Sequence, residues 1–214
     1  MVKKLLSEFD RVKQDSSDDS LFYLEPRLVY HLDINFRARL TQLYRDKLNT
    51  DYTVLDLMSS WVSHLPSEIL YKQVIGHGLN ELELMKNERL DRFWVQDLNK
   101  SQKLPLADNY LDACLMVAAW QYLQYPEELA HELRRVIKPG GKLIVSFSNR
   151  AFWAKAPRIW SEGSDTDHIK YVSNVLDMQG WSSVEHIIEK TSNKFPFSLL
   201  KPQGDPFFSV IAIN

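Results

Sequence analysis

TVLDLMSSWVSHLP, residues 53–66, is the stretch around which the rest of the chain is organised. Its pattern predicts a buried strand over Thr53 to Leu57, a tight turn at residues 58–61, and a helix from about Ser63 to Leu70. Asp56 then lies near the carboxyl end of the strand, where open α/β sheets bind their ligands. The turn contains no glycine, although glycine is what lets a backbone approach a nucleotide-type ligand closely.

Short apolar runs alternate with helical patterns along the rest of the chain. The unbroken apolar run at residues 113–117 is typical of a strand buried on both faces of a parallel sheet. Residues 191–206 contain three prolines and a glycine, so no crossover helix is expected there and the last strand should run antiparallel. The expected strands are 53–57, 72–77, 92–96, 111–117, 142–147, 183–189 and 207–213, and the expected helices after the first are 81–86, 126–137 and 168–179.

These elements predict an α/β fold, a Rossmann-like three-layer sandwich with a seven-stranded, mostly parallel sheet and an antiparallel last strand. Residues 1–20 are polar and mixed in charge, which indicates a short helix or a frayed arm. Residues 22–48 carry apolar side chains at helical spacing and predict one or two further helices. We therefore expect an N-terminal helical cap over residues 1–50 and an α/β domain over residues 51–214, together forming one structural unit.

The composition is that of an ordinary globular protein. The 214 residues are 44% hydrophobic and 25% charged, and 26 Lys and Arg nearly balance 28 Asp and Glu. Without a basic stripe, nucleic-acid binding is not expected. Cys114 is the only cysteine, which excludes an intrachain disulfide and favours a reducing compartment. The N-terminus lacks the apolar core of a secretory signal and no apolar run is long enough to span a bilayer, so we expect a cytoplasmic protein without membrane association.

Five segments resemble the ordered motifs of class I S-adenosylmethionine (SAM)-dependent methyltransferases, and the closest branch is the type 11 group. In that family the turn after the first strand usually carries three glycines, and the end of the second strand carries an acid that binds the ribose. Here the three glycine positions are Met58, Ser60 and Val62, and the position of the acid is Gly78. The five segments are Val54-Leu55-Asp56-Leu57, Val74-Ile75-Gly76, Val95-Gln96-Asp97-Leu98 with Leu104 to Asp112, Ala118 to Leu123, and ELRRVIKPGGKL at residues 132–143.

The resemblance implies a protein that binds SAM as its cofactor and transfers its methyl group to a small-molecule substrate. Because methyl transfer depends mostly on proximity and alignment, no catalytic base is assigned, and the histidine spacing implies no metal. Positions matching the family's cofactor site are Asp56, Met58, Ser59, Ser60, His77, Gly78, Asn80, Asp97, Leu98, Ala118 and Gln121. Candidate substrate residues are His31, Trp120, Phe152, Trp153 and Arg158.

Several alternatives remain open from the sequence. The Asp56 carboxylate is also suited to stabilising the turn by hydrogen bonds. Ser59 and Ser60 are suited to capping a helix N-terminus, and Trp120 to packing in the core. Because the glycines and the ribose acid are missing, a non-catalytic methyltransferase fold that serves as a binding or regulatory module is the second hypothesis. A third, an NAD-dependent enzyme, rests on the G-x-G at residues 76–78, which follows the second strand rather than the first. The oligomeric state is not predicted.

Overall fold

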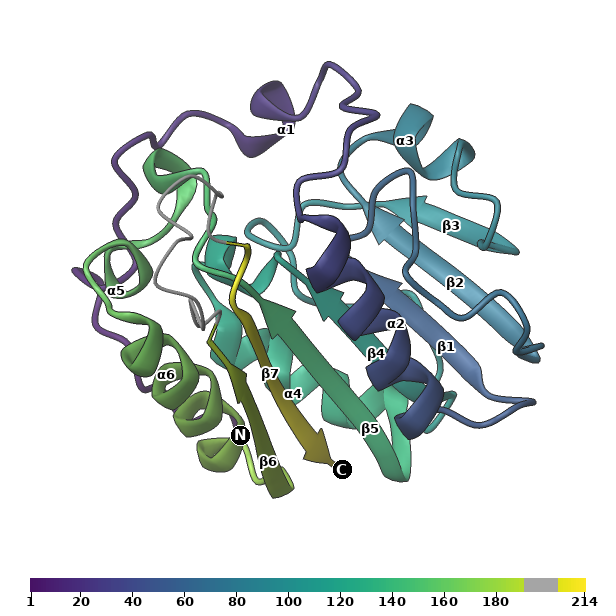
Figure 1. Cartoon of the computed structure of the whole chain (residues 1–214). Helices are drawn as coiled ribbons and strands as arrows, with labels where there is room; N and C mark the ends of the chain where they lie inside the picture. The colour runs from purple at the N-terminus through teal and green to yellow at the C-terminus, as the bar shows by residue number, and fades with distance from the viewer. Residues whose placement is uncertain (191–203) are drawn as a thin grey trace, which may run out of the picture.

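The computed structural model describes residues 1–190 and 204–214 of the chain, and its central feature is a seven-stranded sheet (Figure 1). The strand order is β3-β2-β1-β4-β5-β7-β6, and only β7 runs antiparallel to its neighbours. The predicted fold class is therefore confirmed. The strands are β1 (Thr53–Leu57), β2 (Gln73–Gly78), β3 (Arg92–Val95), β4 (Leu111–Val117), β5 (Ile137–Phe147), β6 (Ser182–Glu189) and β7 (Phe207–Ile213).

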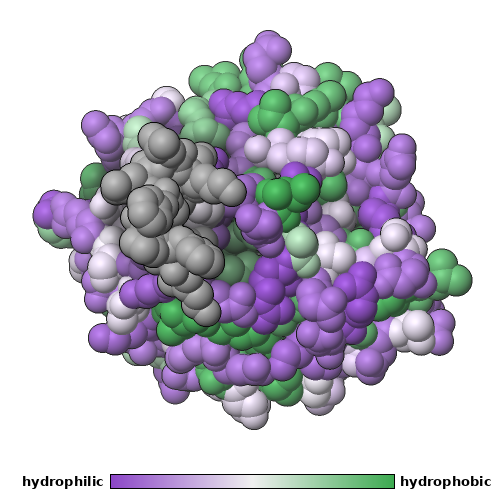
Figure 2. Space-filling model, in the orientation of Figure 1, coloured by the Kyte–Doolittle hydropathy of each residue, from purple (hydrophilic) through white to green (hydrophobic). Residues whose placement is uncertain are grey.

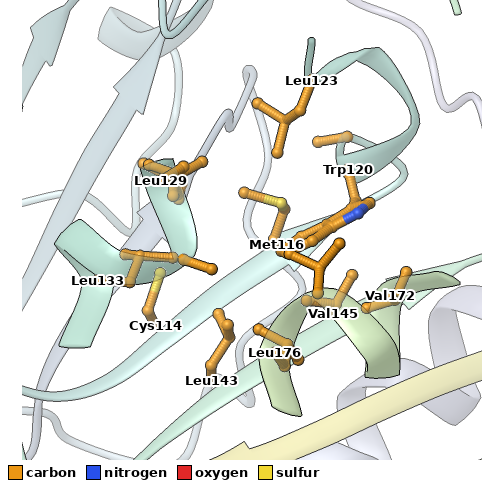
Figure 3. Packing of buried hydrophobic residues seen from close by; sticks show 14 of the residues in the cluster. Cys114, Met116, Trp120, Leu123, Leu129, Leu133, Leu143, Val145, Val172 and Leu176 are labelled. Carbon is orange, nitrogen blue, oxygen red and sulfur yellow. The ribbon is translucent and has the colours of Figure 1, made fainter. Parts of the chain in front are cut away.

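The central strands are apolar because both of their faces are covered. All five residues of β1 are buried, and β4 pairs in parallel with β1 on one side and β5 on the other. On one face, α4 (Pro126–Val136) and α6 (Asp165–Met178) pack on these strands. Figure 3 shows side chains from both helices meeting those of β4 and β5. On the other face, α2 (Ile34–Lys47) packs against the same central strands.

The remaining helices are short and lie in the connections. They are α1 (Asp19–Phe22), α3 (Glu81–Met85) and α5 (Arg158–Ser161), with 3₁₀ turns at Trp120–Tyr122 and Trp153–Lys155. β5 begins at Ile137, before the predicted start at Lys142, because the Pro-Gly-Gly turn is part of the paired segment. The expectation that no crossover helix lies between residues 191 and 206 falls largely outside the described residues.

No helix follows β1, and the prediction of one from Ser63 to Leu70 is wrong. Most hydrogen bonds of this segment go to side chains of other elements, and the backbone bond within it joins Ile69 N–H to the Pro66 carbonyl at 3.4 Å. The carbonyls of Pro66 and Ile69 each accept a hydrogen bond from Arg89 Nη2, both at 3.2 Å, and the His64 carbonyl accepts one from the Thr41 hydroxyl at 2.9 Å. The sheet face that such a helix would cover is occupied by α2. With no helix to begin, Ser59 and Ser60 are not N-caps.

The N-terminal region begins with an arm, residues 1–18. Residues 1–18 contain no helix, although Arg11 and Lys13 are buried. Beyond α1, residues 23–32 form an irregular segment that we call the strap. The strap passes over the carboxyl edge of the sheet before α2 begins (Figure 1). In the described ranges, no helix is long and apolar enough to cross a membrane.

Candidate functional site

A cavity of about 570 Å³ lies at the carboxyl ends of β1, β2, β3 and β4, beneath the strap. This is the edge at which open α/β sheets bind ligands, and the volume falls in the range of small-molecule sites. All eleven residues expected to bind the cofactor line this cavity: Asp56, Met58, Ser59, Ser60, His77, Gly78, Asn80, Asp97, Leu98, Ala118 and Gln121.

The loop after β1 is fastened to β2 by its own backbone amides. Met58 N–H donates to His77 Nδ1 at 3.2 Å, and Ser59 N–H donates to the His77 carbonyl at 2.6 Å. Met58, at the first glycine position of the family motif, keeps a left-handed backbone with φ of +55°. Met58 thus holds a backbone conformation that normally favours glycine, and this conformation costs roughly 1–2 kcal/mol of free energy.

Gly78 is required where it stands because this loop approaches β2 so closely. A Cβ atom added at Gly78 would lie 2.7 Å from the Ser59 carbonyl oxygen. We expect Gly78→Ala to lower the free energy of unfolding by about 1–3 kcal/mol, since a backbone atom must move to make room. Gly76→Ala is the control, because its Cβ would meet the flexible end of Leu90. Urea denaturation of both variants checks the expectation, and an equal cost at the two positions contradicts it.

Asp56 is a buried carboxylate held by two hydroxyl groups. Only 6% of the residue is exposed, and its Oδ2 accepts hydrogen bonds from Ser59 Oγ at 2.7 Å and from Ser63 Oγ. Burial raises the pKa of Asp56 to about 6, although both hydroxyl groups favour the charged form. Since both donors reach Oδ2, Oδ1 remains an acceptor. Asp56 therefore braces the loop and retains capacity to bind a cationic group.

His77 lines the cavity, yet both ring nitrogens are used within the protein. Nδ1 accepts the Met58 N–H, so Nε2 carries the proton and donates to the Gln96 carbonyl at 2.9 Å. The ring also packs on Trp94, with ring centroids 5.1 Å apart. Burial lowers the pKa of His77 to about 4. The imidazole is therefore neutral near pH 7 and ties the ends of β2 and β3 to the loop after β1.

Asn80 and Glu83 hold the strap over the cavity. Asn80 Nδ2 donates to the carbonyls of Tyr23 at 2.9 Å and Leu24 at 3.0 Å, and Asn80 Oδ1 caps α3. Glu83 accepts the Arg27 N–H at 2.6 Å and the Ser60 hydroxyl at 2.5 Å. The Asn80 side chain thus has its hydrogen-bonding groups engaged by the protein itself.

Two residues at other strand ends keep acceptor atoms available. Asp97, just beyond β3, accepts the Asn99 N–H at 2.8 Å through Oδ1, and its Oδ2 lies 3.7 Å from Lys100 Nζ. Gln121, beyond β4, is 1% exposed and donates to the Arg150 carbonyl at 3.3 Å. Within the described part of the chain, Gln121 Oε1 is buried without a hydrogen-bond partner. An acceptor of this kind suits a donor group on a ligand.

Of the candidate substrate residues, His31, Phe152 and Trp153 line the cavity, whereas Trp120 and Arg158 do not. The 3₁₀ turn after β4 directs the Trp120 side chain into the core, where it is 1% exposed (Figure 3). Arg158 lies in α5, where its side chain pairs with Glu162 at 2.8 Å.

The cavity also includes residues that sequence reasoning missed. Arg27 and Tyr23 come from the strap, Arg37 from α2, and Tyr122 from the 3₁₀ turn after β4. No strand end or motif marks the first three, because only the path of the strap and the position of α2 bring them to the sheet edge. Hydrophobic surface gathers along the top of Figure 2. Exposed apolar side chains of the strap, α1 and α3 include Leu21, Leu24, Leu28, Val29, Leu82 and Met85.

Part of the chain is similar in sequence to a known family. Residues 62–145 match the family model of a methyltransferase domain, and the match begins just past the glycine-free loop. Among curated proteins, none matches the chain in sequence.

Solved structures share the fold at low sequence identity. A SAM-dependent methyltransferase from Archaeoglobus fulgidus is 16% identical, with a TM-score of 0.60 over 83% of this chain and 92% of that chain. One from Aquifex aeolicus is 22% identical, with a TM-score of 0.54 over 83% and 88%. The [4+2]-cyclase SpnF is 15% identical, with a TM-score of 0.57 over 82% and 80%. The chain therefore has the fold of SAM-dependent methyltransferases, and its residues 62–145 are similar to a methyltransferase domain.

Proposed function

We propose that the cavity binds SAM and that the protein transfers the SAM methyl group to a small-molecule acceptor. The observation that carries this proposal is that the predicted cofactor residues meet at one cavity. Eleven residues from the ends of four strands, expected from the sequence to contact the cofactor, line one cavity of about 570 Å³. Met58 and Trp61, the side chains best placed to obstruct it, form part of its wall. Bound SAM would supply an electrophilic methyl group on a positively charged sulfur.

The residues at the β3 and β4 ends fit the adenosine part of SAM. Asp97 keeps Oδ2 as an acceptor for the adenine amino group, and Leu98 beside it is an apolar wall for the ring. Gln121 Oε1, without a partner among the described residues, suits a donor from the ligand. Gly78 cannot replace the missing ribose acid, and the Asn80 amide is engaged by the strap. The ribose hydroxyls would therefore be held more weakly than in the family pattern.

The loop after β1 fits the amino group of the methionyl part better than its carboxylate. Asp56, with Oδ1 remaining as an acceptor, would receive the ammonium group. The amides of Met58 and Ser59 are taken by His77, so they do not form a cradle for the carboxylate. Because the pKa of Asp56 is about 6, cofactor affinity should fall as the pH drops below 6 and this carboxylate becomes protonated.

The strap and the loop after β5 would contact the acceptor. Tyr23, Tyr122 and Phe152 give this side of the cavity an aromatic wall. Enclosing the acceptor and the methyl donor in one cavity supplies the proximity on which methyl transfer depends. The acceptor's own nucleophilic atom would attack, with these side chains orienting it and excluding water.

A non-catalytic binding module is the second candidate. It is favoured by the engaged amides of the loop and by Gly78 at the position of the ribose acid. The same fold occurs in a [4+2]-cyclase, so the fold alone does not establish methyl transfer. In this alternative, the cavity would hold a ligand other than SAM.

Titration calorimetry with S-adenosylhomocysteine tests the proposal. We expect saturable binding by the wild type, and binding at least about tenfold weaker by Asp97→Ala, because a charged acceptor for the adenine is lost. Asp108→Ala is the control, since Asp108 is exposed, pairs with Arg135 and lies outside the cavity. No binding heat at millimolar ligand would exclude the cofactor role and favour the binding module.

A further inference from the structure

Among the described residues, the Arg27 guanidinium, which lies in the cavity wall, has no carboxylate partner. It stacks over Phe22 and Phe152, 4.2 and 5.2 Å from the ring centroids. Nη2 donates to the Phe22 carbonyl at 2.9 Å, whereas Nη1 is buried and has no hydrogen-bond partner among the described residues. Burying a donor of a charged group without a partner is costly, so the arrangement favours an acceptor from a ligand.

The acidic side chains of the cavity do not neutralise Arg27. Each has other partners: Asp19 pairs with Lys13 at 2.6 Å, and Asp56 and Asp97 bind the groups described above. Glu83 is used by the Ser60 hydroxyl and by the backbone N–H of Arg27. Residues 191–203 contain no Asp or Glu. The guanidinium charge therefore remains available to a ligand.

The two other arginines of the cavity differ from Arg27 in position or pairing. Arg150 forms an ion pair with Asp205, so its charge is balanced. Arg37 stacks on Tyr30 with its guanidinium 3.6 Å from the ring centroid, and its charge acts on His64 in the segment after β1. Arg37 therefore lies on the side of the cavity where we place the methionyl group. Arg27 lies against the loop after β5.

Aromatic rings surround Arg27 on the acceptor side of the cavity. Phe152 contacts His31 edge-on at 5.7 Å between ring centroids, and stacks on Tyr122 at 6.1 Å. The Tyr122 hydroxyl accepts the Phe152 N–H at 3.0 Å, which fixes both residues. The rings hold the guanidinium in one place while leaving its planar edge able to bind an oxyanion through two hydrogen bonds.

We propose that the methyl acceptor is a flat, aromatic small molecule carrying a carboxylate or phosphate group, and that Arg27 binds this oxyanion. This inference rests on the proposed function, because it concerns the acceptor side of the same cavity. The aromatic wall of Tyr23, Tyr122 and Phe152 accommodates the ring, and the guanidinium sets the charge preference. Neutral analogues would leave the buried Nη1 unsatisfied and bind more weakly.

The carboxylate in the methionyl part of the cofactor is a second oxyanion with the chemistry to bind Arg27. Bound S-adenosylhomocysteine carries that carboxylate, so its affinity reports whether Arg27 holds the cofactor instead. Benzoate, phenyl phosphate and benzamide are the acceptor probes, because they share a ring and differ in charge. Measuring the probes with and without saturating S-adenosylhomocysteine separates the two sources.

Calorimetric or NMR titration should show benzoate or phenyl phosphate binding about tenfold or more tightly than benzamide. The comparison of the two anions distinguishes a carboxylate from a phosphate. In Arg27→Met, the preference for the anion should disappear while S-adenosylhomocysteine affinity stays within about threefold. Arg27→Lys, which keeps the charge without the planar fork, should retain part of the preference.

Arg92→Met is the matched control, since Arg92 also stacks near a ring, that of Tyr110, but lies outside the cavity. Equal binding of benzoate and benzamide, or an unchanged preference in Arg27→Met, would overturn the inference. A loss of S-adenosylhomocysteine affinity in Arg27→Met, with the benzoate preference intact, would assign Arg27 to the cofactor and also overturn it. If S-adenosylhomocysteine does not bind the wild type, the proposed function fails, while the probes in its absence still test the anion preference of Arg27.

Discussion

Arg11→Met is expected to lower the free energy of unfolding by about 3–5 kcal/mol, because it leaves a buried carboxylate without its counter-charge. The carboxylate belongs to Glu127 in the first turn of α4. The Glu127 side chain is fully buried, and only 4% of the Arg11 side chain is exposed. Removing one member of such a pair is far more costly than removing a surface ion pair.

The geometry of the pair supports this magnitude. Arg11 Nη1 lies 3.0 Å from Glu127 Oε2, and Nη2 lies 2.9 Å from Oε1, so the contact is bidentate. Glu127 Oε1 also accepts the backbone N–H groups of Leu5 at 3.0 Å and Leu6 at 2.8 Å. Burial alone would raise the pKa of Glu127, but these hydrogen bonds outweigh it and lower the pKa. The folded protein therefore contains the charged carboxylate.

Urea denaturation at pH 7 measures the effect. The double variant Arg11→Met with Glu127→Met should recover much of the lost stability, because it removes both charges from the interior. Arg158→Met removes an exposed pair with Glu162 and should cost no more than about 1 kcal/mol. A loss in Arg11→Met as small as that in Arg158→Met would contradict the expectation.

The same anchor positions the residues that enclose the cavity. Next along the arm, Lys13 pairs with Asp19, which in turn accepts a hydrogen bond from Asn99 at 2.9 Å beside the end of β3. Lys155, 1% exposed, donates to the Ser17 carbonyl at 2.8 Å. These contacts fix where the strap begins, so detaching the arm should also weaken ligand binding.

The sheet could be predicted from the sequence because burial on both faces leaves a direct mark on strand composition. The predicted bounds of β1 and β4 agree with the structure, and the antiparallel β7 followed from the prolines between β6 and β7. The segment after β1 carries no such mark, and a helix was wrongly predicted there. Leu65 of this segment packs in the core beneath α2, as a helical residue would, whereas backbone carbonyls of the segment bind the distant side chains of Arg89 and Thr41.

The cofactor side of the candidate site was predictable because its residues belong to strand ends. Asp56, Gly78 and Asp97 reach the cavity because parallel strands end at one edge of the sheet. Arg27 is brought there by hydrogen bonds from the strap to Asn80 and Glu83, whose partners are more than 50 positions away in sequence. Local patterns carry no information about such pairings.

Stability should fall by about 3 kcal/mol between pH 6.5 and pH 4 on account of His77 alone. Burial lowers the pKa of this imidazole from its ordinary value of 6.5 to about 4 in the folded protein. One pKa unit corresponds to about 1.36 kcal/mol of free energy. Between these pH values the unfolded chain binds a proton at this position and the folded protein does not. Acid therefore favours unfolding. Above pH 6.5 His77 causes no loss of stability, and the loss grows as the pH falls toward the folded-state pKa of about 4.

Other cavity groups titrate in the same window, so a variant is needed to isolate His77. Burial, followed by the charge of Arg37, lowers the pKa of His64 to about 4, which adds to the acid-induced loss. The pKa of Asp56, raised to about 6, acts in the opposite direction, since the folded protein then binds the proton more tightly than the unfolded chain. Burial also lowers the pKa of His31 and of His168, so the wild-type pH profile is the net result of all these groups.

His77→Gln separates the contribution of His77 from that of the other titrating groups. Its amide has an acceptor for Met58 N–H and a donor for the Gln96 carbonyl, so both hydrogen bonds can be retained without a titrating group. Denaturation from pH 7 to pH 4 should therefore show a loss about 3 kcal/mol smaller than in the wild type. His131→Gln, at an exposed position on α4, should keep the wild-type profile. Parallel profiles for His77→Gln and the wild type would mean that His77 accepts a proton in the folded protein, which the two contacts at its ring nitrogens oppose.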